Sequence, residues 1–138
     1  MRKPMAYRIH CLSVMFKMRL LKKIRLKSPT WYRKKCVNKA KLEAKERDNW
    51  TCQKCGKPVE GKNAHGSHIY NEGTYKSMSA DVDNILTMCY YDHINWWHKN
   101  PLEASEWFKT KYPELYKTLR ERARKTQIIN WQKRYETQ

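Results

Sequence analysis

Three cysteines and one aspartate have the spacing of a metal site. Two residues lie between Cys52 and Cys55, and two residues also lie between Cys89 and Asp92. Zinc in proteins takes four thiolate, imidazole or carboxylate ligands, and a C-x-x-C turn presents two of them to one ion. We therefore predict a structural Zn²⁺ bound by Cys52, Cys55 and Cys89, with Asp92 as the fourth ligand and His93 as the alternative. A redox pair would instead be expected in a thioredoxin-like βαβ setting, which the sequence does not show.

Four of the five histidines lie within a stretch that also holds these cysteines, namely His65, His68, His93 and His98. Histidine is the usual general base near neutral pH and a common metal ligand. Hydrolysis of a phosphodiester needs a base for the attacking water, a cation at the phosphate and a group that orients the base. The cluster contains residue types that can supply all three.

The order of these residues resembles a known family. The chain reads C-x-x-C, then H-x-S-H-I, then D-x-D-N-I-L-x-M-C-x-x-D-H. This is similar to the HNH nucleases, in particular to phage-borne HNH proteins and the NinG-type recombination nucleases of lambdoid phages. The resemblance covers about residues 42–110. The resemblance implies a ββα-metal unit, in which two strands and a helix surround one divalent ion, Mg²⁺ or Mn²⁺.

The resemblance also implies roles for single residues. His68 matches the histidine that activates water, and Asn84 matches the asparagine that pins the loop and helps to orient it. His93 matches the last histidine of the motif, a ligand of the catalytic ion. Ser67 stands where many relatives carry an aspartate or histidine ligand, so the missing ligand is expected from His65 or His98.

Each of these residues also has a simpler interpretation. His65 can be an exposed loop residue, Asn84 a turn residue, and His98 a helix cap or the partner of a carboxylate. His98 follows His93 by five positions, which in a regular α-helix is about 140° around the axis and suits chelation poorly. The aromatic residues near positions 96–116 are interpreted as core.

The charge of the chain is strongly positive and uneven. The formal net charge is +17, and residues 1–50 hold 16 basic and 3 acidic side chains. Such an excess is typical of a protein that binds a polyanion, because each neutralised phosphate releases a counterion. We expect contacts with DNA phosphates from one group of basic residues, Arg33, Lys34, Lys35, Lys39 and Lys41. A solvated basic face and binding to an anionic membrane surface are the alternatives.

The pattern predicts a small α+β protein with a zinc-braced ββα unit, flanking helices and a basic N-terminal arm. The expected divisions are a partly helical arm (1–41), an HNH-like nuclease domain (42–110) and one or more basic C-terminal helices (111–138). Helices are expected over 31–48, from about 92, over 101–111 and from 113, with strands at 64–70 and 84–88 and a strand–turn–strand knuckle at 50–58.

The function expected from these features is metal-dependent hydrolysis of DNA by a phage-type endonuclease. The alternative is a zinc-knuckle protein that binds nucleic acid without cutting it. No run of eighteen apolar residues and no signal peptide is found, so a soluble intracellular protein without a membrane partner or small-molecule cofactor is expected.

Overall fold

The computed structural model describes residues 27–125 and 127–138, and the first 26 residues of the expected arm lie outside this part. The longest element is helix α2 (Pro29–Arg47), which agrees with the predicted helix over 31–48. The Ser28 hydroxyl accepts a hydrogen bond from the Trp31 amide at 3.2 Å and so caps the first turn. Pro29 suits a first helical position because its missing N–H would be unpaired there.

The end of α2 leads into the cysteine knuckle. Asn49 and Trp50 both have φ near +50°, a left-handed conformation that turns the chain sharply. The predicted strand–turn–strand at 50–58 is reduced to a single antiparallel bridge between Thr51 and Pro58. Gly56 has a φ of +73°, which glycine adopts without steric cost, so its place in the turn is as expected.

The sheet has two antiparallel strands, β1 (His65–His68) and β2 (Ile85–Met88). Both are shorter than predicted but lie within the predicted ranges. The register pairs His65 with Met88 and His68 with Ile85. The expected loop between the strands contains two short 3₁₀ helices, η2 (Lys76–Met78) and η3 (Val82–Asn84). Another short 3₁₀ helix, η1 (Gly61–Asn63), precedes β1.

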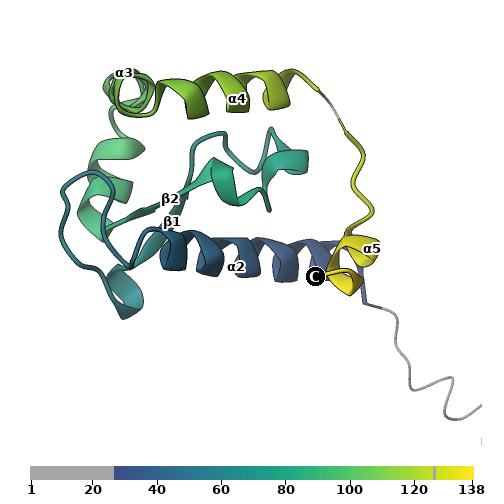
Figure 1. Ribbon diagram of the computed structural model, residues 1–138. Coiled ribbons are helices and arrows are strands. Elements are labelled where there is room, and N and C mark those ends of the chain that lie inside the picture. The colour runs from purple at the N-terminus through teal and green to yellow at the C-terminus, as the bar shows by residue number, and fades with distance from the viewer. Residues whose placement is uncertain (1–26, 126) are drawn as a thin grey trace, which may run out of the picture.

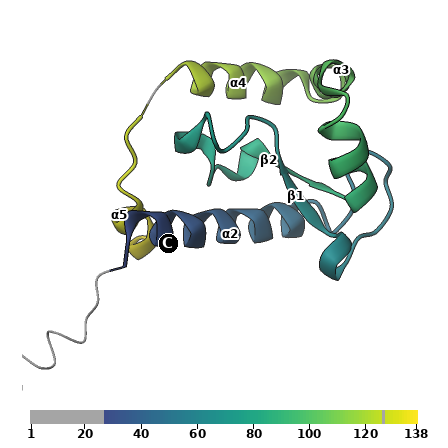
Figure 2. The same ribbon diagram turned by 180° about the vertical axis from the view of Figure 1, so that it is seen from behind.

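The sheet lies between helices on both faces (Figures 1 and 2). On one side α2 packs on Ile85, in a cluster that includes Cys36 and Ala40. On the other side, Leu86 and Met88 pack with residues of α3 (Pro101–Lys111) and α4 (Pro113–Arg124), among them Phe108 and Leu119. Both helices begin with proline, as predicted. The sheet is therefore the middle layer of a small mixed α+β structure.

The C-terminal helix α5 (Trp131–Glu136) returns to the first half of α2 (Figure 1). Trp131 packs against the cluster under α2, and the ring centroid of Tyr135 lies 5.5 Å from that of Trp31. The side chain of Ile128, shortly before this helix, is fully exposed. Helix α2 itself runs across the division expected between residues 41 and 42.

The segment after β2 is π-helical. This segment, η4 (Tyr91–Trp97), begins close to the predicted start near Asp92 but is not a regular α-helix. Its hydrogen bonds join residues five apart, as between the His98 amide and the His93 carbonyl at 3.3 Å. Residues five apart therefore become neighbours, which changes the geometry expected for His93 and His98.

Candidate functional site

Cys52, Cys55, Cys89 and Asp92 lie close together and could hold a metal ion. Their ligand atoms are all within 4.8 Å of one another. Oδ2 of Asp92 lies 3.2 Å from Sγ of Cys52 and 3.2 Å from Sγ of Cys89. Sulfur and oxygen ligands of one zinc ion, at ~2.3 and ~2.0 Å from it, would be ~3.5 Å apart in a tetrahedron. The structure therefore brings together the four residues expected as ligands. Of the two alternatives for the fourth ligand, Asp92 and His93, Asp92 is the one that lies in the cluster.

The protonation of this cluster depends on whether a cation is bound. Burial raises the pKa of the Cys89 thiol to about 12. Burial alone would also raise the pKa of Asp92, but hydrogen bonds from the thiols of Cys55, Cys52 and Cys89 lower it below its usual value. The cluster would thus hold a carboxylate among thiols that resist ionisation, and a divalent ion would stabilise all four in their anionic form.

Local hydrogen bonds hold the knuckle against the sheet. The Cys52 amide donates to the Lys57 carbonyl at 2.8 Å, which closes the turn. The Gln53 amide donates to the Thr87 carbonyl at 2.8 Å, and the Thr87 amide donates to the Asp48 carboxylate at 2.9 Å. The end of α2, the knuckle and β2 are therefore fixed together, and Cys89 follows directly after β2.

Three histidines meet beside the cysteine cluster. Nδ1 of His93 is 2.9 Å from Nδ1 of His65, and Nε2 of His93 is 3.0 Å from Nε2 of His98. His65 comes from β1 and His93 from η4, so these residues belong to different elements. Burial, followed by the neighbouring His98 and His65, lowers the pKa of His93 to about 4. The argument that a spacing of five suits chelation poorly assumed a regular α-helix, whereas the π-helical η4 brings the rings of His93 and His98 together.

His68 lies at the end of β1 and is held by the loop that follows. Its Nε2–H donates to the Ser79 carbonyl at 2.8 Å, which leaves Nδ1 as the basic nitrogen. Nδ1 lies 3.8 Å from the Glu72 carboxylate. Burial is the largest cause of a lowered pKa at His68, so the ring is neutral at pH 7. Neutral imidazole with a free Nδ1 can accept a proton.

Asn84 is fully buried and closes the loop that holds His68. Its side chain donates to the carbonyls of Tyr70 at 2.9 Å and Met78 at 3.1 Å, and accepts from the Tyr70 amide at 2.8 Å. These bonds tie the two ends of the loop together. Asn84 thus acts on the backbone next to Ser79, and among the described residues it makes no direct hydrogen bond to His68.

Ser67 is buried, and its hydroxyl has no hydrogen-bond partner among the described residues. It shares a face of β1 with His65, because alternate residues of a strand point the same way.

The five basic residues expected at DNA all lie on α2 but not on one side of it. At 100° per residue, Lys34 and Lys41 share one side and Lys35 and Lys39 another.

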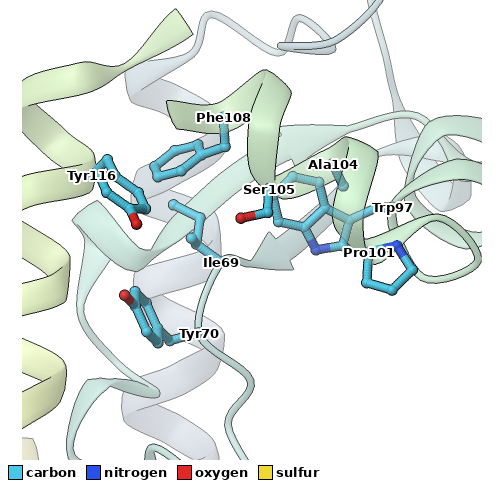
Figure 3. Close-up of a pocket in the computed structure, with 8 residues that line it drawn as sticks. All are labelled: Ile69, Tyr70, Trp97, Pro101, Ala104, Ser105, Phe108 and Tyr116. Carbon is cyan, nitrogen blue, oxygen red and sulfur yellow. The ribbon is translucent and has the colours of Figure 1, made fainter. Parts of the chain in front are cut away.

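An aromatic pocket lies apart from the candidate site residues. A pocket of about 270 Å³ opens on the α3 side of the sheet, and Tyr70, Trp97, Phe108 and Tyr116 line it (Figure 3). None of the candidate site residues lines it, and most of these rings also pack in the core, as expected from the sequence. Among the described residues no helix is long and apolar enough to cross a membrane.

Comparison of the chain with protein-family models, curated proteins and solved structures gave no match.

Proposed function

We propose that this protein is a metal-dependent endonuclease that hydrolyses DNA phosphodiester bonds at the histidine cluster. The observation that supports this most strongly is the position of His93 between His65 and His98, one residue after the cysteine cluster. Two nitrogens bound at ~2.1 Å to one ion with octahedral geometry lie ~3.0 Å apart. Both nitrogen–nitrogen distances, 2.9 and 3.0 Å, match this separation.

The hydrogen bonds favour His65 over His98 as the second ligand. Nε2 of His65 lies 3.0 Å from the Lys62 carbonyl and must donate its proton there, so the lone pair is on Nδ1, which faces His93. An ion between these two Nδ1 atoms leaves the Nε2–H of His93 free to donate to Nε2 of His98. His98 would then orient His93, as second-layer partners of metal-bound histidines do.

His68 is the proposed general base. Nδ1 accepts the proton of the attacking water, while the bond from Nε2 to Ser79 holds the ring in the required tautomer. Asn84 keeps the loop that carries Ser79 closed. A Mg²⁺ or Mn²⁺ ion would supply positive charge at the phosphate and the leaving oxygen. A zinc ion at the cysteine cluster would have the separate task of bracing η4 and the knuckle.

A plasmid-nicking assay with purified protein and Mg²⁺ or Mn²⁺ tests this function. Wild-type protein should nick DNA and stop in EDTA, and His68→Ala should lose about 10²–10⁴ in rate while its zinc content and melting temperature stay unchanged. His65→Ala should need more Mg²⁺ or Mn²⁺ for half-maximal rate. His98→Ala should keep the wild-type metal requirement and lose less rate.

Two outcomes contradict the proposal in different ways. Cleavage by His68→Ala at the wild-type rate would exclude His68 as the base. DNA binding by the wild type without any nicking would favour the alternative function, a zinc-knuckle protein that binds nucleic acid and does not cut it. Ser67, which stands where many HNH nucleases have a metal ligand, is the feature that favours this alternative.

A further inference from the structure

Lys41 of α2 lies directly on the strand that carries His65 and His68. A Cβ placed on Gly66 would be 2.8 Å from Cγ of Lys41 and 3.1 Å from its Cβ. Such distances are too short for real carbon contacts, so the Lys41 stem occupies the space that any other residue at position 66 would need. Because Gly66 has no side chain, the stem of Lys41 can pack on β1 at a position between His65 and His68 in the chain.

The position of Lys41 distinguishes it from the other basic residues of α2. It is half-buried, whereas Lys34, Lys35 and Lys39 are exposed. Within residues 27–125 and 127–138 its ammonium group has no hydrogen-bond or ion-pair partner. An ammonium group without a partner in the protein is available to an anion that enters the site.

The charge of Lys41 also acts on the proposed base. The Lys41 stem lies over Gly66, and His68 is the next residue on the same face of β1, because alternate residues of a strand point the same way. Burial is the main cause of the lowered pKa at His68, and the Lys41 charge lowers this pKa further. A phosphate placed at His68 would therefore lie within the field of the Lys41 ammonium.

We propose that Lys41 is a catalytic residue that binds the scissile phosphate and stabilises the additional negative charge of its transition state. This rests on the proposed nuclease function. Water adds its oxygen to phosphorus and gives its proton to His68. The bond from phosphorus to the leaving sugar oxygen breaks, and that oxygen takes a proton from solvent. Lys41 keeps its own protons throughout, whereas Arg33, Lys34, Lys35 and Lys39 would contact the DNA backbone only.

Lys41→Met is the first test, because methionine keeps an aliphatic chain over Gly66 and removes only the charge. With saturating DNA and Mg²⁺, its single-turnover rate should fall about 10²-fold, the usual effect of losing one group that stabilises transition-state charge. Its affinity for DNA in EDTA should change only a few-fold. Lys41→Arg should recover part of the rate, because it restores the charge.

Lys45→Met is the matched control. Lys45 is also half-buried and follows Lys41 by one turn of α2, but its ammonium lies over the Trp50 ring, 5.6 Å from the centroid. Its single-turnover rate should equal that of the wild type. Lys41→Gln is the second variant, and because it removes the charge but keeps Cβ and Cγ over Gly66, the rate should fall with little change in melting temperature.

The outcomes separate this proposal from the function on which it rests. If the wild type cuts DNA and Lys41→Met cuts equally fast, the role of Lys41 is wrong and the nuclease function stands. Equal losses in Lys41→Met and Lys45→Met would also overturn it, since they would indicate a general effect of positive charge. If Lys41→Met does not fold, Lys41→Gln decides in the same way. A wild type that does not cut DNA overturns both proposals.

Discussion

Nε2 of His68 donates a hydrogen bond to the carbonyl of Ser79, 11 residues further along the chain, at 2.8 Å. The orientation of the imidazole therefore depends on the backbone of the segment 79–85. Three arginines from three helices hold this segment, and we call them the arginine clamp: Arg47, Arg122 and Arg134. The proposed base is thus positioned by helices that precede and follow the sheet.

The clamp contacts five of the seven residues of this segment. Arg134 of α5 donates to the Ala80 carbonyl at 2.9 Å, next to Ser79. Arg122 of α4 binds the carboxylates of Asp81 and Asp83 at 2.8 and 2.9 Å. Arg47 of α2 donates to the carbonyls of Val82 at 2.9 Å and Ile85 at 2.7 Å.

Arg134→Met should therefore lower kcat about tenfold without a comparable change in KM, because a loosened Ser79 carbonyl holds His68 less well while the DNA contacts remain. Lys133→Met is the control, since Lys133 is the exposed neighbour on the same helix, and it should leave kcat unchanged. Steady-state kinetics with the melting temperature of both variants measure this. A loss confined to KM or to stability would show that Arg134 does not position the base.

Removal of the metal should unfold the protein. A zinc ion held by thiolates contributes about 10–16 kcal/mol in small zinc domains, which is comparable to the ~5–15 kcal/mol stability of a whole domain. Cys52→Ser should lose the bound zinc in elemental analysis and the cooperative thermal transition. Cys36→Ser is the control, because Cys36 is equally buried but belongs to α2 and packs in the other core cluster, away from the proposed metal ligands. It should keep stoichiometric zinc, and a zinc-free wild type with a cooperative melt would contradict the structural role of the metal.

The dependence of cleavage on pH should follow His68. Burial lowers its pKa below the ordinary 6.5, so kcat should be constant near pH 7 and should fall only below pH 6.5. The nearby Glu72 charge raises the pKa of His68, so Glu72→Gln should move this acid limb to lower pH. A shift to higher pH would contradict the assignment. Zinc content measured over the same range excludes loss of the metal as the cause.

The same lowered pKa affects stability. The unfolded chain binds a proton at His68 before the folded chain does, so the contribution of neutral His68 is fully present above pH 6.5. It is lost as the pH falls through the folded-state pKa. His68→Gln should therefore show a smaller decrease in melting temperature between pH 7 and pH 5 than the wild type.

The N-terminal arm should set the salt dependence of DNA binding. Residues 1–26 contain eight basic and no acidic side chains. Log K falls linearly with the logarithm of the salt concentration, and each phosphate contact that is lost makes this slope less steep by ~0.9. Deletion of residues 1–26 should therefore weaken binding and flatten the slope. The single-turnover rate at saturating DNA should change little. An unchanged slope would show that the arm does not contact DNA phosphates.

The sequence by itself determined the features that depend on short stretches of backbone. The spacing of Cys52 and Cys55, and of Cys89 and Asp92, brings each pair of ligands together within one turn. The capping serine and the two helix-starting prolines mark where α2, α3 and α4 begin. These features depend on neighbours a few residues away, so they can be predicted from one sequence.

The tertiary structure decided which distant side chains meet. His93 contacts His98 only because η4 is π-helical, and it contacts His65 only because β1 pairs with β2 in this register. The Lys41 stem lies on β1 because α2 packs over Gly66, and the arginine clamp exists because α4 and α5 return to the segment 79–85. Such contacts depend on packing between elements that are far apart in the chain, where a shift of one residue or a change of helix type would separate the groups.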